Sequence, residues 1–320
     1  MIGVSSQTLD SMMADEWQYI TRDSIARAAD HLNLSADKVF EFVQVKFWEP
    51  IHEGNQCTFL RGSQDSEGFP VDFSIPGLDN QATDEIKNYI RTDSLRFIYA
   101  DRKREIEELL ELARKQNCIV IGGSKSNAAT EVLLSKFFDA EPFDSSEPNR
   151  HKIPFGFCYG GDDTLVKQSS LTCSNMAREK TKDSPGIALE GVHVPSDYRE
   201  DEEDYFTAEI KKGTDAGLVF VANRPFKTTE NVKLIVVAGF TGIGTVGACR
   251  ALIKDFRYLE PLNEEPCVYG VVQVTYSKKA KSKIRTFKKY EWIYRKGGHL
   301  PIDPNQKKLV DRQLQSSRPS

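Results

Sequence analysis

The sequence predicts an α/β protein with a mainly parallel sheet and an N-terminal helical module. Two stretches carry this prediction, residues 118–138 and 233–253, because each combines a buried strand, a glycine loop and a helix. Residues 103–116 have apolar side chains at helical spacing and directly precede the first of these units. Helices that alternate with buried strands are typical of parallel sheets.

Length and composition indicate a folded cytosolic protein. The chain has 320 residues, of which 39% are hydrophobic and 28% charged, so it can form one large or two ordinary cores. Its six cysteines form no CxxC pair and several lie in apolar runs, which predicts reduced, buried thiols. The N-terminus lacks a signal-peptide pattern, and no apolar run reaches the ~20 residues of a membrane span. We therefore expect a cytoplasmic protein that does not associate with membranes.

Charge and composition vary along the chain. Residues 1–60 carry four basic and nine acidic groups, whereas residues 271–320 carry thirteen basic and three acidic ones. Bulk attraction for polyanions is therefore expected only at the C-terminal end. The predicted segments are a helical module (1–48), connecting strands and helices (49–116), an α/β domain (117–298) and a polar tail (299–320).

Residues 24–43 read as two helices joined by a short turn. Within them, "AADHLNLSADKVF" resembles the helix-turn-helix of Fis-like DNA-binding proteins, which have an alanine pair, a tight turn and an exposed second helix. Asn33 stands at the position of the turn glycine, and asparagine accepts the left-handed conformation. The second helix is net negative, unlike helices that read the major groove. Two interpretations stay open, a DNA-reading helix and a helical packing or dimerisation module.

Shorter elements surround the two glycine units. They are strands or a hairpin between 47 and 76, a helix at 79–91, and strands at 153–159, 216–222 and 268–276. Residues 196–209 are acidic and predict a solvated loop or a lid. The basic-aromatic segment 278–296 predicts either a surface that stacks on and neutralises nucleic acid or an edge hairpin kept soluble by lysines.

Three apolar strands are followed by loops with phosphate-binding character. Ligands of parallel α/β sheets bind at the carboxyl ends of strands, so these loops would line one crevice if the strands are neighbours. Gly123 and Gly242 should then lie close together at that edge. Backbone amides, hydroxyls and two cations would face a phosphate there. The candidate binding residues are Gly122, Gly123, Ser124, Lys125, Ser126, Asn127, Asn223, Arg224, Gly239, Thr241, Gly242, Gly244 and Thr245.

Residues 242–247 match the dinucleotide fingerprint GxGxxG. Such glycines let the backbone approach a pyrophosphate at a helix N-terminus. The acidic residue expected about twenty positions on, at the ribose, falls near Glu264 and Glu265, which precede the next strand rather than follow it. The motif also lies near the end of the sheet, which counts against an ordinary dehydrogenase. Ligand contact and close helix–strand packing both explain these glycines, and residues 122–127 equally predict a plain turn with Asn127 as helix N-cap.

Few residues point to catalysis. The chain has no GxSxG motif, and its five histidines show no metal-binding spacing, so we expect no metal. Glu131 lies one turn into the helix after the first glycine loop and is the candidate general acid or base; a solvated helix position is the alternative. Whether the chain is an enzyme stays open.

The segments "IVIGGSKSNAATEVLL" and "LIVVAGFTGIGTVGACRAL" resemble the strand-end loops of bacterial Rossmann-like nucleotide-sensing domains, which include TIR-like and SLOG-like modules. This fold-level resemblance covers residues 117–275, and such domains are often fused to an N-terminal helical module. It implies a ligand-sensing regulatory or signalling protein that binds NAD(P), another nucleotide or another phosphorylated small molecule. An NAD(P)-using or NAD-cleaving enzyme and a non-catalytic structural protein are the other functions left open. We also expect a homo-oligomer.

Overall fold

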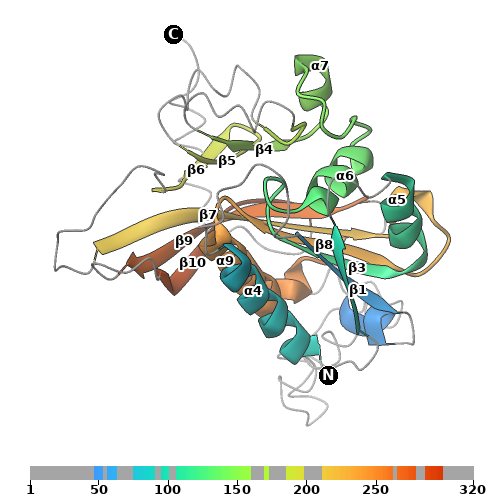
Figure 1. Ribbon diagram of the computed structural model, residues 1–320, viewed down its shortest axis with the longest axis horizontal. Coiled ribbons are helices and arrows are strands. Elements are labelled where there is room, and N and C mark those ends of the chain that lie inside the picture. The colour runs from blue at the N-terminus through green and yellow to red at the C-terminus, as the bar shows by residue number, and fades with distance from the viewer. Residues whose placement is uncertain are drawn as a thin grey trace, which may run out of the picture.

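The computed structural model describes most of the chain from residue 47 to residue 297 (Figure 1). The described residues are 47–52, 56–62, 75–90, 95–100, 106–159, 169–172, 185–197, 211–261, 265–278 and 285–297. The helix-turn-helix prediction, the polar tail and most of the acidic segment 196–209 lie outside them. None of the described helices has both the length and the apolar character that crossing a membrane requires.

A seven-stranded sheet forms the centre of the protein, with the strand order β10-β9-β7-β8-β3-β1-β2. Its strands are β1 (Cys57–Gly62), β2 (Leu95–Ala100), β3 (Asn117–Ile121), β7 (Lys211–Asn223), β8 (Lys233–Gly239), β9 (Val268–Lys278) and β10 (Arg285–Lys296). β2, β1, β3 and β8 pair in parallel, whereas β7, β9 and β10 pair antiparallel. The α/β class is confirmed, but the sheet is mixed rather than mainly parallel. The physical reason is the connection 224–232, which is shorter than the dozen or so residues of a parallel crossover and so returns β8 antiparallel to β7.

Helices and a second sheet cover the two faces of the central sheet (Figure 1). One face packs against α4 (Ile75–Ile90), α9 (Gly242–Asp255) and the helical residues 47–52. The other packs against α5 (Ile106–Lys115), α6 (Ala128–Phe137) and a three-stranded antiparallel sheet of β4 (Phe155–Cys158), β5 (Gly186–Leu189) and β6 (Val192–Pro195). The remaining short helices are α7 (Glu147–Arg150), η2 (Pro225–Lys227) and η3 (Phe256–Tyr258).

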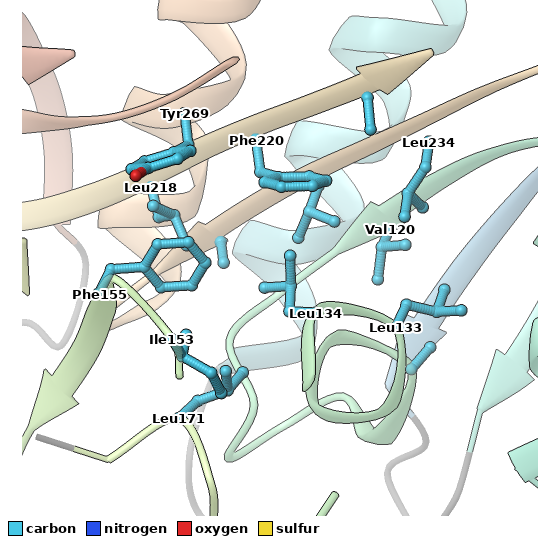
Figure 2. Packing of buried hydrophobic residues seen from close by; sticks show 14 of the residues in the cluster. Val120, Leu133, Leu134, Ile153, Phe155, Leu171, Leu218, Phe220, Leu234 and Tyr269 are labelled. Carbon is cyan, nitrogen blue, oxygen red and sulfur yellow. The ribbon is translucent and has the colours of Figure 1, made fainter. Parts of the chain in front are cut away.

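Alternation along β7 builds both cores. Leu218 and Phe220 face α6 and the small sheet, whereas Val219 and Val221 face α9, as the two-residue period of a strand requires. Figure 2 shows the first core, where Phe220 lies over α6 and Tyr269 of β9 lies beside Phe155 of β4. Burying side chains of this size stabilises the fold by roughly 1.5–3 kcal/mol each. The small sheet is therefore part of the hydrophobic core.

Most predicted elements are confirmed, and the exception is a short aromatic segment. The helices expected at 79–91 and 103–116 are α4 and α5, and the strand expected at 268–276 is β9. Residues 47–52, for which strands were expected, are helical because Phe47, Trp48 and Ile51 bury one helix face in the core. In such short aromatic segments the tertiary contact decides the secondary structure.

Three further expectations meet the structure. Residues 57–115, within the predicted connecting segment 49–116, supply β1, α4, β2 and α5 to the central sheet. The basic-aromatic segment forms β10, the edge strand of a hairpin with β9, as the second of its two interpretations predicted, and Trp292 is buried. Cys57, Cys118, Cys249 and Cys267 are free and buried as expected, whereas Cys158 is disulfide-bonded. A disulfide needs only that two thiols meet in the fold, which sequence spacing does not reveal.

A glycine-to-alanine pair tests how closely α9 packs on the sheet. A Cβ at Gly247 would lie 2.1 Å from Val274 Cγ2, whereas one at Gly77 of α4 would meet nothing within 4 Å. We expect Gly247→Ala to lower the free energy of unfolding by roughly 1–3 kcal/mol and Gly77→Ala to raise it by up to about 1 kcal/mol. Urea denaturation measures both. Adding Val274→Ala to Gly247→Ala should recover part of the loss, and strict additivity of the two substitutions would contradict the contact.

Candidate functional site

The chain reverses its direction across the sheet between β1 and β3. β1 leads through α4, on one face, to β2 at the edge of the sheet, and α5 on the other face brings the chain back past β1 to β3. In open α/β sheets, the ligand crevice forms at such a switch point, outside the carboxyl ends of the two strands. The glycine loop 122–127 follows β3 at this place.

The two glycine loops lie in direct contact. β3 and β8 are parallel neighbours, with Ile121 opposite Val237. A Cβ at Gly123 would lie 2.8 Å from the carbonyl oxygen of Gly239, so that no larger residue fits without displacing backbone. The two loops therefore meet at the carboxyl ends of two parallel strands, through Gly123 and Gly239. The expected closeness of Gly123 and Gly242 stays a prediction.

The loop 122–127 also packs closely on β1. A Cβ at Gly62 would lie 1.7 Å from the carbonyl oxygen of Ser126. Gly122 has a φ of 106°, in the region that favours glycine. The Asn127 side chain caps α6 by accepting a hydrogen bond from the Ala129 amide at 2.9 Å. Its amide group also donates to the Leu60 and Ile121 carbonyls, at 3.0 and 2.8 Å. Asn127 therefore fixes the loop on the ends of β1 and β3, in agreement with the N-cap interpretation.

Part of this loop keeps free hydrogen-bonding capacity. Ser126 and Asn127 donate their amides to the Gly123 carbonyl, and the Ser126 hydroxyl donates to the same carbonyl at 3.2 Å. The amides of Gly123 and Ser124 and the Ser124 hydroxyl make no hydrogen bond within the described residues. Lys125 is half-buried, with its ammonium 5.5 Å from the centre of the Tyr159 ring. Within the described structure, two amides and a hydroxyl of this loop therefore have no internal partner, and the cation Lys125 follows them in the chain.

The fingerprint loop is occupied by a carboxylate of the protein itself. Oδ2 of Asp215, at the centre of β7, accepts hydrogen bonds from the Thr241 hydroxyl at 2.6 Å and from the Gly244 and Thr241 amides at 2.9 and 3.3 Å. Burial raises the pKa of Asp215, and these hydrogen bonds together with the charge of Arg285 oppose that effect. A phosphate at the α9 N-terminus would have to displace this carboxylate.

The fingerprint glycines serve close packing. A Cβ at Gly244 would lie 2.2 Å from the Ala216 carbonyl oxygen, and one at Gly239 would lie 2.1 Å from the Thr245 amide. A Cβ at Gly242 would lie 2.8 Å from the Leu78 side chain of α4. The packing interpretation of these glycines therefore accounts for each of them.

Asn223 and Arg224 lie away from the crevice. Since β7 is antiparallel to β8, Gly217 rather than Asn223 pairs with Gly239, and Asn223 pairs with Lys233 at the opposite edge. There the Asn223 amide donates to Glu260 Oε1 at 2.6 Å, and Lys233 Nζ contacts Glu260 Oε2 at 2.5 Å. The expectation that these two residues complete the ligand crevice is wrong, because it assumed a parallel β7.

Glu131 has a structural role in place of the expected catalytic one. Its side chain is 1% exposed and accepts hydrogen bonds from the Phe143 amide, the Ser169 hydroxyl, and the amide and hydroxyl of Ser170. These bonds tie two loops to α6 and use the lone pairs that a general base would need. Neither the catalytic nor the solvated interpretation of Glu131 holds.

One buried carboxyl between the glycine loops was missed from the sequence. Asp79 of α4 lies with Oδ2 2.8 Å from the position of a Cβ on Gly122, and the Thr245 side chain hydrogen-bonds to its carboxyl. Burial raises the pKa of Asp79 to about 7 despite this hydrogen bond. Its Oδ1 is inaccessible to solvent and has no hydrogen-bond partner in the described structure. The order of elements pointed to this region, because α4 follows β1 and therefore begins near the switch point between β1 and β3.

A separate groove lies on the α4 and α9 side of the sheet. It encloses about 400 Å³ and is lined by Gln81, Ile243, Arg250, Arg285, Thr286 and Phe287. Its two guanidinium groups are engaged, because Arg250 forms a bidentate pair with Glu85 and Arg285 donates to the Thr241 hydroxyl at 3.3 Å. None of the predicted binding residues lines this groove. The part of the chain that the structure describes holds no cluster of three metal-ligating side chains.

Comparison with known proteins gives no relative from which to transfer a function. No protein-family model matches the chain, and no curated protein or solved structure matches it significantly. The strand order and the loop geometry define an α/β protein with a glycine loop at a topological switch point, and its function must be argued from that loop.

Replacing Asp215 tests whether its carboxylate holds the fingerprint loop. Asp215→Asn places an amide group against three donors, so we expect a loss of roughly 1–3 kcal/mol in the free energy of unfolding. Asp197→Asn is the matched control, because Asp197 accepts from the Thr214 amide and hydroxyl at an exposed position. It should cost less than about 0.5 kcal/mol. If chemical denaturation shows equal losses of unfolding free energy for the two variants, burial does not strengthen the hydrogen bonds of Asp215.

The raised pKa of Asp79 predicts a pH-dependent stability. Its pKa is 3.8 without perturbation and about 7 in the folded protein, so the folded state binds more protons between these values and stability falls as pH rises. Asp79→Asn removes this effect. We expect the variant to gain stability relative to the wild type from pH 4 to pH 8, by at most about 4 kcal/mol. Urea titrations at several pH values measure the difference, and a constant difference would exclude a raised pKa.

Proposed function

We propose that this chain is a ligand-sensing protein whose α/β domain binds a nucleotide or another phosphorylated small molecule at the carboxyl edge between β1 and β3. The observation that carries the proposal is the pair of amides at Gly123 and Ser124, which make no hydrogen bond to any described residue and lie at the topological switch point. The strand order β2-β1-β3-β8 also supports a Rossmann-like assignment for the parallel half of the sheet.

The chemistry of the loop suits a phosphate. Phosphate oxygens accept hydrogen bonds, and the loop offers two amides, the Ser124 hydroxyl and the Lys125 ammonium. The close approach of Gly62 and Gly123 to neighbouring backbone keeps these donors in a fixed arrangement. A preformed set of donors reduces the entropy lost on binding.

A sensing role requires that the site communicate with the rest of the chain. β8 runs from the glycine loop at one edge of the sheet to Lys233 at the other. There the Lys233 ammonium lies 4.1 Å from the centre of the Phe47 ring, and the Asn117 side chain donates to the Pro50 carbonyl at 2.7 Å. The helical residues 47–52 thus join the N-terminal segment to the strand that carries the site. DNA binding by residues 1–48 and homo-oligomerisation stay predictions.

An enzyme that uses NAD(P) through the fingerprint is less consistent with this geometry. The Asp215 carboxylate lies where the pyrophosphate of a dinucleotide would bind the helix N-terminus. Glu131 makes four internal hydrogen bonds, so its own carboxylate is not available as a general base. We therefore favour binding at the 122–127 loop over catalysis at the fingerprint.

Ligand binding tests the proposal directly. The full chain is titrated calorimetrically with AMP, ADP-ribose, NAD, ribose 5-phosphate and inorganic phosphate. We expect saturable binding of at least one, weakened about tenfold by Lys125→Ala because a charge-assisted hydrogen bond is lost. Lys115→Ala is the control, since Lys115 is an exposed cation at the end of α5, next to the opposite edge of the sheet. Absence of binding by every compound, or equal loss in both variants, would refute the proposed site.

A further inference from the structure

Among the described carboxyl groups near the glycine loops, Asp79 keeps an unused oxygen. Asp215 and Glu131 each accept at least four hydrogen bonds from protein donors. Asp79 has the Thr245 hydroxyl as a partner, while its Oδ1 is sealed from solvent without one. An unpaired buried acceptor loses its solvation without compensation, so a structural role alone does not explain it.

The position of Asp79 connects it to the phosphate-binding loop. Its Oδ2 and the Ser126 hydroxyl lie 2.8 and 3.1 Å from the point that a Cβ on Gly122 would occupy. Thr245, on its other side, belongs to the first turn of α9. The carboxyl is therefore inserted between the two glycine loops, one residue away from the free amide of Gly123.

We propose that Asp79 is a ligand-specificity residue, whose Oδ1 accepts a hydrogen bond from a sugar hydroxyl of a phosphorylated ligand held by the loop 122–127. This inference rests on the proposed function and narrows it to sugar phosphates and nucleotides. It assigns the phosphate to the loop amides and the hydroxyl-bearing ring to the side of α4.

A hydroxyl suits this carboxyl better than an ammonium group. Hydroxyls both donate and accept, so a hydroxyl pairs with the ionised carboxylate and with the protonated acid. An ammonium group only donates, so it cannot accept a hydrogen bond from the hydroxyl of a protonated acid. Because the pKa of Asp79 is about 7, both protonation states occur near neutral pH. A neutral hydroxyl also spares the cost of burying a second charge.

The test compares ribose 5-phosphate with inorganic phosphate on the full chain, by isothermal titration calorimetry. We expect the wild type to bind ribose 5-phosphate at least tenfold more tightly. Asp79→Ala, which removes both carboxyl oxygens, should abolish this preference and leave the affinity for inorganic phosphate within twofold. Asp84→Ala, at an exposed position on the same helix, is the matched control and should leave both affinities unchanged.

The outcomes separate this inference from the function on which it rests. If Asp79→Ala keeps the preference, or weakens both ligands equally, Asp79 makes no hydroxyl contact and the inference fails while phosphate binding stands. The inference also fails if the wild type binds both probes equally. If neither probe nor AMP binds, the proposed function fails as well. Should Asp79→Ala not fold, an analogue of ribose 5-phosphate that lacks every ring hydroxyl replaces the variant, and wild-type affinity equal to that for ribose 5-phosphate overturns the contact.

Discussion

The close approach of α9 to β7 and β9 is the constraint on which the rest of the structure depends. Glycine at 244 and 247 lets the helix backbone contact the sheet, and the Asp215 carboxylate satisfies the amides at the helix N-terminus. This contact fixes the end of β8, which places Gly239 against Gly123 and brings the two loops together. Close helix–sheet packing and the shape of the candidate crevice thus share one cause.

Buried carboxyl groups divide by how fully they are paired. Asp215 and Glu131 are saturated with hydrogen bonds and hold loops in place, whereas Asp79 retains an unpaired oxygen. A carboxylate whose acceptor sites are filled by the protein has little left to offer a ligand or a proton. Pairing, rather than burial or nearness to a glycine motif, therefore separates the structural acids from the candidate binding residue.

Sequence patterns predicted the local elements well and their arrangement only in part. Apolar runs and helical spacing indicated α5, β3, α6, β8 and α9, because burial of one face imposes its period on the chain. The antiparallel direction of β7 was not predicted, although the connection 224–232 is too short for a parallel crossover. Because β7 was assumed to be parallel, Asn223 and Arg224 were assigned to the wrong edge of the sheet. Asp79 gave no local signal, since nothing in the neighbouring residues distinguishes it from other acids at the start of a helix; only the order of elements pointed to it.

By itself, the sequence determined that two glycine loops end two buried strands, because glycine is required wherever backbones approach within the reach of a Cβ. It did not determine whether that approach serves a phosphate or the protein. Only the tertiary structure decided, by bringing Asp215 from β7 into the fingerprint and leaving the amides of Gly123 and Ser124 unengaged. Hydrogen-bond partners distant in sequence meet only when the sheet is assembled, so pairing is a property of the fold.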